Sequence, residues 1–269
     1  MILSISPCPN DTFMFDAIVN KKIDLRGYNF DCTFSDIDLL NQYAKESTAD
    51  ISKVSCAVAA QIMDSYNILQ SGAALGHGNA PLLVSKRKIY PDEVKYCKVA
   101  IPGFDTTATL LLKDNFGEVK ELRTYLFSDI MEAIHSDEVD AGVLIHEERF
   151  SYRDKSLQLI ADLAQKWNSE SKLPIPLGAI VVRNSLDMEV QRDISSIIAE
   201  SVAYAFANKK ESWNFIKSHS QSLSDSVIES HIEMFVNNYS LNLGVKGREA
   251  IERLFKIGGY DEISNISFV

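Results

Sequence analysis

His146 has the strongest case for chemistry in this sequence. It directly follows the apolar run Ala141–Ile145, which predicts a buried strand, so the histidine stands where that strand ends. Imidazole titrates near neutral pH and is the side chain that most often moves a proton in an active site. Glu147 or Glu148 could orient the ring, and Arg149 could bind an anion. His146 is therefore a candidate general base; the alternative is a histidine that only packs in the fold.

Two loops lead into expected helices and could bind an anion. Ser6–Asp11 connects an expected strand to a helix, and Phe104–Thr109 repeats that order. The first backbone N–H groups of a helix have no partner within it and suit a carboxylate or a phosphate. Three threonine hydroxyls in the second loop could add donors for an anion or a sugar. The alternative in both loops is a plain helix cap, for example by Asn10 or Asp11.

Lys53 could supply a positive charge at the end of another expected strand, Ile51–Val54. Open α/β sheets present ligand-binding groups at such strand ends. A lysine there could pair with the carboxylate of a substrate. The alternative is a solvated lysine beside a helix cap at Ser55, because lysines are usually exposed.

The composition indicates a globular chain and argues against some classes of binding partner. The 269 residues are 46% hydrophobic and 24% charged, which is ordinary for a folded protein. The net charge is −10, from 27 basic and 37 acidic residues, so we expect no general nucleic-acid binding. Four separated cysteines without a CxxC pair favour reduced thiols over disulfides or a zinc site. With no recognisable signal peptide or membrane segment, we expect a cytoplasmic protein.

Sequence motifs of several common sites are missing. There is no phosphate-binding P-loop, no GxSxG nucleophile elbow and no HExxH zinc motif. The glycine-rich stretch Gly76–Pro81 ends in proline and precedes an expected strand, whereas a dinucleotide site has the strand first. The motifs therefore indicate neither a zinc site nor a dinucleotide site.

Short apolar runs alternate with helical patterns, which predicts an α/β fold with a mostly parallel sheet. The pattern restarts after a polar stretch at 86–93, and the last third of the chain is helical. We expect two lobes with a ligand cleft between them, the arrangement of type II periplasmic-binding-protein-like folds. The larger lobe would comprise 1–85 plus 183–269, and the smaller lobe 86–182.

Several motifs occur together in an order that resembles one enzyme family. They are Ser6–Phe13, Lys53–Ser55, Gly76–Leu82, Pro102–Gly103 with Thr106–Ala108, Ile145–Phe150 and Leu173–Gly178. Together they are similar to the 1,4-dihydroxy-6-naphthoate synthases of the futalosine route to menaquinone. The resemblance covers nearly the whole chain, and the segments SPCPNDT and IHE are its most specific parts.

The resemblance implies a lyase that converts cyclic dehypoxanthine futalosine to 1,4-dihydroxy-6-naphthoate, with loss of the sugar-derived portion. It implies an active site between the lobes, a small-molecule substrate that carries a carboxylate, and no metal or organic cofactor. The family's catalytic base falls on His146, and its substrate-contacting segments fall on Lys53, Val54, Ser55, Thr107, Ala108 and Thr109. The remaining residues of the expected binding set are Asn10, Asp11 and Arg149.

Three other functions are compatible with parts of this pattern. Chorismate dehydratase, an earlier enzyme of the same route, would share the fold, but the IHE and SPCPNDT segments favour the naphthoate synthase. A non-catalytic binding protein for a small carboxylate would return its ligand unchanged, and the missing signal peptide argues against it. A ligand-sensing regulator of the LysR type would need an N-terminal pair of DNA-binding helices, whereas this sequence starts with an expected strand.

Overall fold

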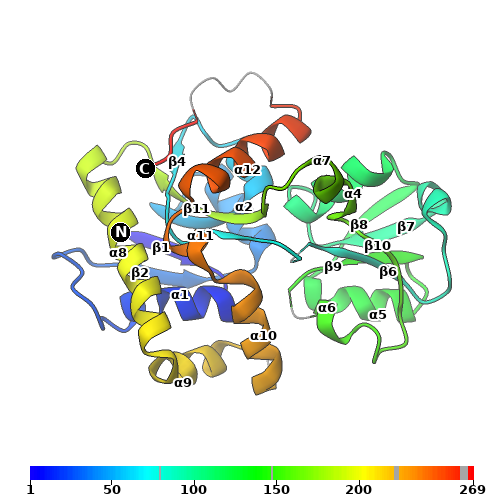
Figure 1. The fold of residues 1–269 in the computed structure, drawn as a ribbon, viewed down its shortest axis with the longest axis horizontal. Coiled ribbons are helices and arrows are strands. Elements are labelled where there is room, and N and C mark those ends of the chain that lie inside the picture. The colour runs from blue at the N-terminus through cyan, green and yellow to red at the C-terminus, as the bar shows by residue number, and fades with distance from the viewer. Residues whose placement is uncertain (79, 147, 221–223, 261–265) are drawn as a thin grey trace.

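Two β-sheets, each covered by helices, divide the molecule into two lobes (Figure 1). The structure, a computed structural model, describes residues 1–269 except 79, 147, 221–223 and 261–265. The expected two-lobed α/β architecture is confirmed. Among the described residues, no helix combines the length and the apolar character needed to cross a bilayer.

The first sheet has the strand order β2-β1-β3-β11-β4, and β5 also pairs with β11. Its strands are β1 (Ile2–Ile5), β2 (Asp31–Phe34), β3 (Ile51–Ser55), β4 (Tyr66–Ile68), β5 (Ala74–Gly76) and β11 (Ile175–Arg183). All five residues of β3 are buried, because the strand has sheet neighbours on both sides and helices over the sheet. The residues at its end are therefore held firmly.

The second sheet has the strand order β10-β6-β9-β7-β8. Its strands are β6 (Leu82–Ser85), β7 (Lys98–Ile101), β8 (Glu121–Thr124), β9 (Ala141–Leu144) and β10 (Gln158–Asp162). The apolar run before His146 forms β9, and all four of its residues are buried. The expected strand before the candidate base is therefore present.

Both sheets are mixed, so the expectation of a mostly parallel sheet is wrong. β1 runs parallel to β2 and β3, and β7 runs parallel to β8 and β9. In contrast, β11 is antiparallel to β3, β4 and β5, and β6 is antiparallel to β9 and β10. Strand–helix alternation implies parallel pairing only where a helix returns the chain to the same sheet. β6 and β11 instead enter their sheets from the other lobe.

The sheets divide the chain at different points from those expected. β6 precedes the expected boundary at 85/86 but lies in the second sheet, and β11 begins before 182/183 but lies in the first. The chain therefore crosses between β5 and β6 and again between β10 and β11. These strands are apolar on both faces, so their sequence does not show which sheet they join. β11 also includes Pro176, where its register with β5 shifts.

Helices of the first 170 residues cover both sheets. They are α1 (Pro9–Val19), α2 (Ile37–Lys45), α3 (Cys56–Ala59), α4 (Thr107–Phe116), α5 (Ile130–His135), α6 (Glu148–Ser151) and α7 (Gln165–Glu170), with 3-10 turns at Pro91–Tyr96 and Phe127–Asp129. One hydrophobic cluster joins Val54 and Leu75 of the first lobe to Leu111 and Val143 of the second. The base of the cleft is therefore a packed core shared by both lobes.

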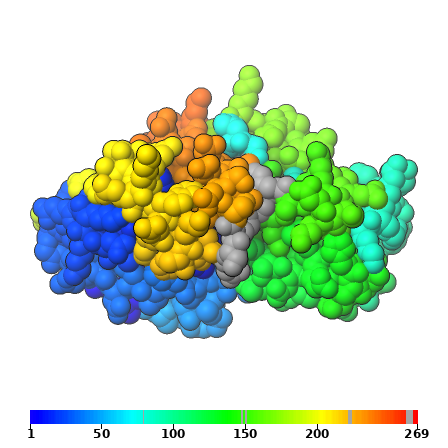
Figure 2. Space-filling view, turned by 90° about the horizontal axis from the view of Figure 1, so that it is seen from below, coloured from blue at the N-terminus to red at the C-terminus, as the bar shows by residue number. Residues whose placement is uncertain are grey.

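The C-terminal helices return to the first lobe, as expected. They are α8 (Met188–Ala207), α9 (Lys209–His219), α10 (Asp225–Phe235), α11 (Asn238–Leu241) and α12 (Gly244–Ile257). The residues Ile194, Ile197, Ile198 and Val202 recur at helical spacing and form the buried face of α8. Helices α8, α9 and α10 pack against α1, and Figure 2 shows this C-terminal part lying directly beside the N-terminal segments. α1, which carries Asn10 and Asp11, is consequently buried along nearly its whole length.

Candidate active site

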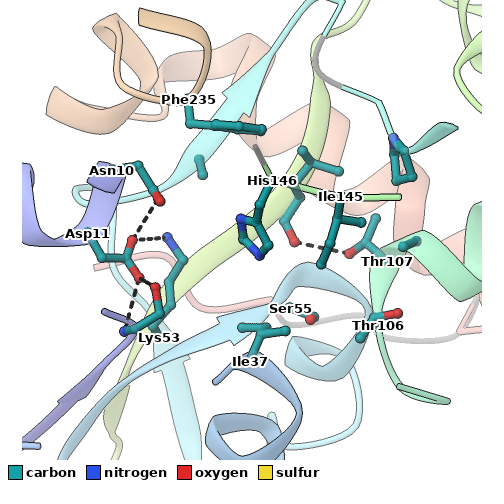
Figure 3. Close-up of a pocket in the computed structure, with 16 residues that line it drawn as sticks. Asn10, Asp11, Ile37, Lys53, Ser55, Thr106, Thr107, Ile145, His146 and Phe235 are labelled. Atoms are coloured by element: carbon teal, nitrogen blue, oxygen red, sulfur yellow. Dashed lines mark hydrogen bonds and ion pairs between the residues drawn. The ribbon is translucent and has the colours of Figure 1, made fainter. Parts of the chain in front are cut away.

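A cavity lies in the cleft between the lobes, as the sequence predicted (Figure 3). The cavity region encloses about 660 Å³ of space not filled by protein atoms, a figure that includes open solvent. Both lobes contribute to its wall. The lining residues are Ser6, Asn10, Asp11, Ile37, Lys53, Ser55, Ala74, Pro81, Thr106, Thr107, Ala108, Ile145, His146, Leu177, Gly178 and Phe235.

His146 lies two residues after the end of β9 and lines this cavity. Its backbone has φ of +51°, a conformation that non-glycine residues rarely adopt and that is concentrated at functional sites. Figure 3 shows the imidazole projecting toward the middle of the pocket, between Phe235 and Ile37. The end of β9 therefore turns the ring toward the space that a ligand would occupy.

The surroundings of His146 keep its ring neutral at physiological pH. Phe127 and Phe235 lie with ring centroids 5.0 and 6.3 Å from the imidazole. Burial lowers the pKa of His146 to about 4; the positive charge of Lys53 acts in the same direction, and Asp11 opposes both. One ring nitrogen of a neutral imidazole carries a lone pair, so His146 is in the protonation state that a base requires.

A buried ion pair forms the opposite wall of the cavity. Lys53 Nζ lies 2.9 Å from Asp11 Oδ1, and the two side chains are only 6% and 1% exposed. The carboxylate also accepts hydrogen bonds from Ser6 Oγ at 2.6 Å and from Asn10 Nδ2 at 2.8 Å. Such additional hydrogen bonds are what a buried ion pair needs to offset desolvation. Lys53 is therefore not a solvent-exposed lysine, which was the alternative, and its charge is already balanced within the protein.

Gly178 allows Lys53 to reach this position. Gly178 lies opposite Ser55 in the pairing of β11 with β3. A Cβ atom at this position would lie 2.7 Å from Lys53 Cε, which is closer than real Cβ contacts. The glycine therefore leaves the space through which the lysine side chain passes toward Asp11.

Asn10 presents an unused acceptor to the cavity. Its Nδ2 donates to the Asp11 carboxylate, which fixes the orientation of the amide because a carboxylate accepts only. The other amide atom, Oδ1, is buried and has no hydrogen-bond partner among the described residues. A buried acceptor without a donor costs about 1–3 kcal/mol. A hydroxyl or amine of a ligand would satisfy it.

Ser55 is held by a residue that the sequence did not single out. Asn41 Oδ1 accepts from the Ser55 backbone N–H at 2.8 Å, and Asn41 Nδ2 donates to Ser55 Oγ at 3.1 Å. Since the serine oxygen already accepts from Asn41, its own hydrogen can be donated into the cavity. Asn41 lies on the same helical face as Ile37, Leu40 and Ala44, and a buried amide on an apolar stripe was the signal that could have identified it.

The N-terminus of α4 forms the second-lobe wall. Thr106 caps the helix by accepting from Thr109 N, and the hydroxyls of Thr106 and Thr109 both donate to Gly103 O. Thr107 Oγ1 accepts from Ala57 N at 3.2 Å and donates to Leu177 O at 3.1 Å, which ties α4 to the first lobe. The three hydroxyls are thus engaged within the protein. The donors left for a ligand are the first backbone N–H groups of the helix, at Thr107 and Ala108.

Residues 1–260 match the family model described as menaquinone biosynthesis. The chain belongs to this family. A 1,4-dihydroxy-6-naphtoate synthase of Thermus thermophilus is 38% identical over 256 residues, covering 94% of this chain and 92% of the relative. A protein of Streptomyces coelicolor with the same name is 35% identical over 257 residues, covering 94% and 90%. The expected family is confirmed, and the chain is an enzyme of menaquinone biosynthesis.

Solved structures agree with this assignment of the fold. A crystal structure of an Archaeoglobus fulgidus protein is 32% identical, covers 97% of each chain and superposes with a TM-score of 0.91. The periplasmic aliphatic sulphonate binding protein of Escherichia coli superposes with a TM-score of 0.66 at 10% identity, over 98% of this chain and 87% of the other. That second likeness concerns the fold alone, and it confirms the expected periplasmic-binding-protein-like architecture.

Within this menaquinone biosynthesis enzyme, most of the expected site residues meet at one cavity. His146, Lys53, Ser55, Thr107, Ala108, Asn10 and Asp11 all line it. Val54 points into the shared core, and the Thr109 hydroxyl is bonded beneath the loop before α4. Arg149 Nη1 donates to Gly78 O at 2.7 Å and contacts Met234 Sδ at 2.9 Å, outside the cavity lining. Glu147, one of the groups expected to orient His146, lies outside the described residues.

Phe235 is a site residue that the sequence analysis missed. It comes from the end of α10, 89 positions after His146, and reaches the cavity because α10 packs against α1 and β5. No local pattern distinguishes it from an ordinary buried aromatic residue. In the part of the chain that the structure describes, no three or more histidine, cysteine or acidic side chains come together in a way that could hold a metal ion.

Proposed function

We propose that this enzyme is a 1,4-dihydroxy-6-naphthoate synthase that converts cyclic dehypoxanthine futalosine to 1,4-dihydroxy-6-naphthoate in the futalosine route to menaquinone. The observation that carries the proposal is a neutral imidazole, His146, projecting into an interlobe cavity in a chain whose curated relatives bear this name.

In this proposal His146 acts as the general base. Its neutral ring removes a proton from a carbon next to the substrate's carbonyl group, so the C–H electron pair moves into the ring that becomes aromatic. The bond to the sugar-derived portion breaks, that portion leaves with the bonding electrons, and the imidazolium returns the proton to it. No electron is exchanged with an external carrier. A positioned base typically contributes about 10²–10⁴-fold to such a step.

The remaining cavity groups suit the parts of this substrate. The backbone N–H groups of Thr107 and Ala108 at the α4 N-terminus favour a carboxylate or a developing oxyanion. The unused acceptor of Asn10 suits a hydroxyl of the sugar-derived portion. The ion pair of Lys53 with Asp11 is neutral as a unit, so it does not compete with the helix for the substrate's negative charge. We assign the substrate-binding role to these groups, with Ser55 as a further donor.

The test is a chromatographic assay of purified, metal-stripped protein with cyclic dehypoxanthine futalosine, run beside His146→Ala. We expect dihydroxynaphthoate from the wild type, and a fall in turnover of about 10²–10⁴-fold in the variant. Substrate affinity of the variant, measured by calorimetry, should stay close to that of the wild type, because the base acts mainly in the transition state. Comparable turnover in the two proteins would remove His146 from the mechanism. A wild type that leaves this substrate unchanged but dehydrates chorismate would reassign the enzyme.

A further inference from the structure

A second histidine lies directly behind His146, away from the substrate cavity. His231 of α10 is fully buried, and its Nε2 lies 3.4 Å from His146 Nδ1. The two rings are nearly parallel, with an interplanar angle of 20° and centroids 5.6 Å apart. Phe235, one helical turn after His231, packs against both rings at centroid distances of 4.6 and 6.3 Å. The aromatic packing holds the two imidazoles in this relation.

The two histidines come from different lobes. His146 follows β9 of the second sheet, whereas α10 packs against α1 and β5 of the first lobe. Figure 1 shows α10 on the side of the first lobe that faces α6 of the second. The contact between Arg149 of α6 and Met234 of α10 spans the same junction. The histidine pair is therefore one of the contacts that join the two lobes.

Only one hydrogen can lie between His231 Nε2 and His146 Nδ1. Burial lowers the pKa of His231 well below its ordinary value, with the nearby imidazole of His146 and the charge of Lys53 adding to that shift. Both rings are therefore neutral, and each carries one N–H. If His146 carries its hydrogen on Nδ1, its Nε2 has the lone pair and can act as a base. If His231 Nε2 donates instead, the hydrogen of His146 is on Nε2, and that atom cannot accept a proton.

We propose that His231 is a positioning residue for the base: its Nε2 accepts the Nδ1–H of His146, which leaves the lone pair of His146 Nε2 for the substrate. This role depends on the proposed function, because it requires His146 to be the base. It adds that α10 of the first lobe sets the tautomer of a residue carried by the second. The contact between the lobes then prepares the base at the same junction that lines the cavity.

The contact also contributes differently before and after proton transfer. At 3.4 Å it is long for a hydrogen bond between neutral groups, so before proton transfer it selects the tautomer but adds little further stabilisation. Once His146 holds the substrate's proton, the Nδ1–H belongs to an imidazolium, and charge-assisted hydrogen bonds are shorter and about twice as strong. An interaction that strengthens only as the proton moves raises kcat more than it lowers KM.

The first test reads the tautomer directly and needs no turnover. Long-range ¹H–¹⁵N correlation spectra of protein labelled with ¹⁵N in its histidine rings show which nitrogen carries hydrogen, and His146→Gln assigns the signals. We expect His146 to be the Nδ1–H form in the wild type and to revert in His231→Phe to the Nε2–H form that prevails in free imidazole side chains. His231→Gln, whose amide oxygen can accept in place of Nε2, should keep the Nδ1–H form. An Nε2–H form in the wild type, or no change in His231→Phe, would overturn the proposal.

The second test separates positioning from packing. His231→Phe keeps the size and ring stacking but removes the acceptor, so kcat should fall about 10- to 100-fold, the loss typical of removing the orienting partner of a functional imidazole. KM should stay within about threefold, and His231→Gln should recover most of the rate. Equal losses in both variants, or a change confined to KM, would leave only a packing role.

His219→Phe is the matched control for this series. His219 is half-buried and packs against the tilted rings of Phe34 and Phe215 with centroid distances of 4.6 and 4.4 Å, but it lies outside the cavity lining. Its replacement should leave both the His146 tautomer and kcat unchanged. A wild-type protein without synthase activity would refute the proposed function, while the spectra would still decide the tautomer.

Discussion

The N-termini of α1 and α4 face the same cavity, and both follow a strand and a short loop, yet they are prepared for opposite partners. Asp11 in the first turn of α1 places a carboxylate of the protein itself there, and Lys53 balances it. The first turn of α4 has no acidic residue, and the threonine hydroxyls around it are bonded within the protein. The first helix end is thus filled internally, whereas the second is open to an anion from outside.

The two helix ends differ in a way that their shared strand–loop–helix order does not reveal. The strand–loop–helix order identifies a helix end that can attract negative charge, but it does not say whether the protein provides that charge itself. Asp11 answers the question at α1 only because Lys53, 42 positions away, is brought to it by the pairing of β1 with β3. We therefore expect the first lobe to form a fixed wall and the second lobe to bind the carboxylate of the proposed substrate.

The largest effect should come from breaking the internal pair at α1. Lys53→Met leaves Asp11 buried without its counter-charge, which typically costs about 3–5 kcal/mol in free energy of unfolding. Denaturant unfolding measures it. Replacing both partners, as Lys53→Met with Asp11→Leu, should restore part of that stability, since no unpaired buried charge then remains.

A matched surface pair tests whether burial is the reason. Lys45 and Asp105 also form an ion pair, at 2.6 Å, but their side chains are 34% and 40% exposed. Lys45→Met should cost no more than about 1 kcal/mol. If the two lysine variants lost similar free energies of unfolding, burial would not be the reason that the Lys53–Asp11 pair matters.

The next largest effect, on substrate binding, should come from giving α4 an acidic residue in its first turn, as α1 has. Ala108→Asp places a carboxylate in the first turn of α4, where it would occupy the helix end and repel the carboxylate of the proposed substrate. We expect binding of the substrate to weaken about 10- to 100-fold, corresponding to about 1.4–2.8 kcal/mol. Ala108→Asn has nearly the same shape without the charge and should weaken binding much less. Equal effects of Asp and Asn would point to steric exclusion rather than to an anion site.

The pH dependence of kcat/KM tests the environment of His146, which the second lobe carries. Its pKa is lowered to about 4, so the ring is unprotonated throughout the physiological range. The acidic limb of kcat/KM should therefore lie near pH 4, rather than near 6.5 where an unperturbed histidine titrates. Because the unfolded chain binds this proton at higher pH than the native protein, the His146 contribution to stability declines as pH falls from about 6.5 to 4. Rates across about pH 3–8 measure the limb, and a limb near 6.5 would contradict the proposed environment.

What the sequence could predict was local. The run Ala141–Ile145 specifies a buried strand through its own residues, so the place of His146 at a strand end was predictable. The roles of Phe235 and His231 depend on how α10 packs against α1 and β5, which no nearby residue encodes. The sheet membership of β6 and β11 was unpredictable for the same reason, since a strand buried on both faces looks alike in either sheet.

The smallest effect on substrate affinity should come from Thr107→Val, and it separates the role of the hydroxyl from that of the backbone N–H groups at the α4 site. Thr107→Val keeps the shape and the N–H but removes the hydroxyl that links Ala57 N to Leu177 O. Losing these hydrogen bonds should lower the free energy of unfolding by about 1–3 kcal/mol, because the partners lie in a buried junction. If the N–H groups bind the substrate's carboxylate, affinity should change less than about threefold, well below the effect of Ala108→Asp. Calorimetric titration of Thr107→Val decides between them: a large loss of affinity with little loss of stability would assign the hydroxyl, and not the helix end, to the substrate.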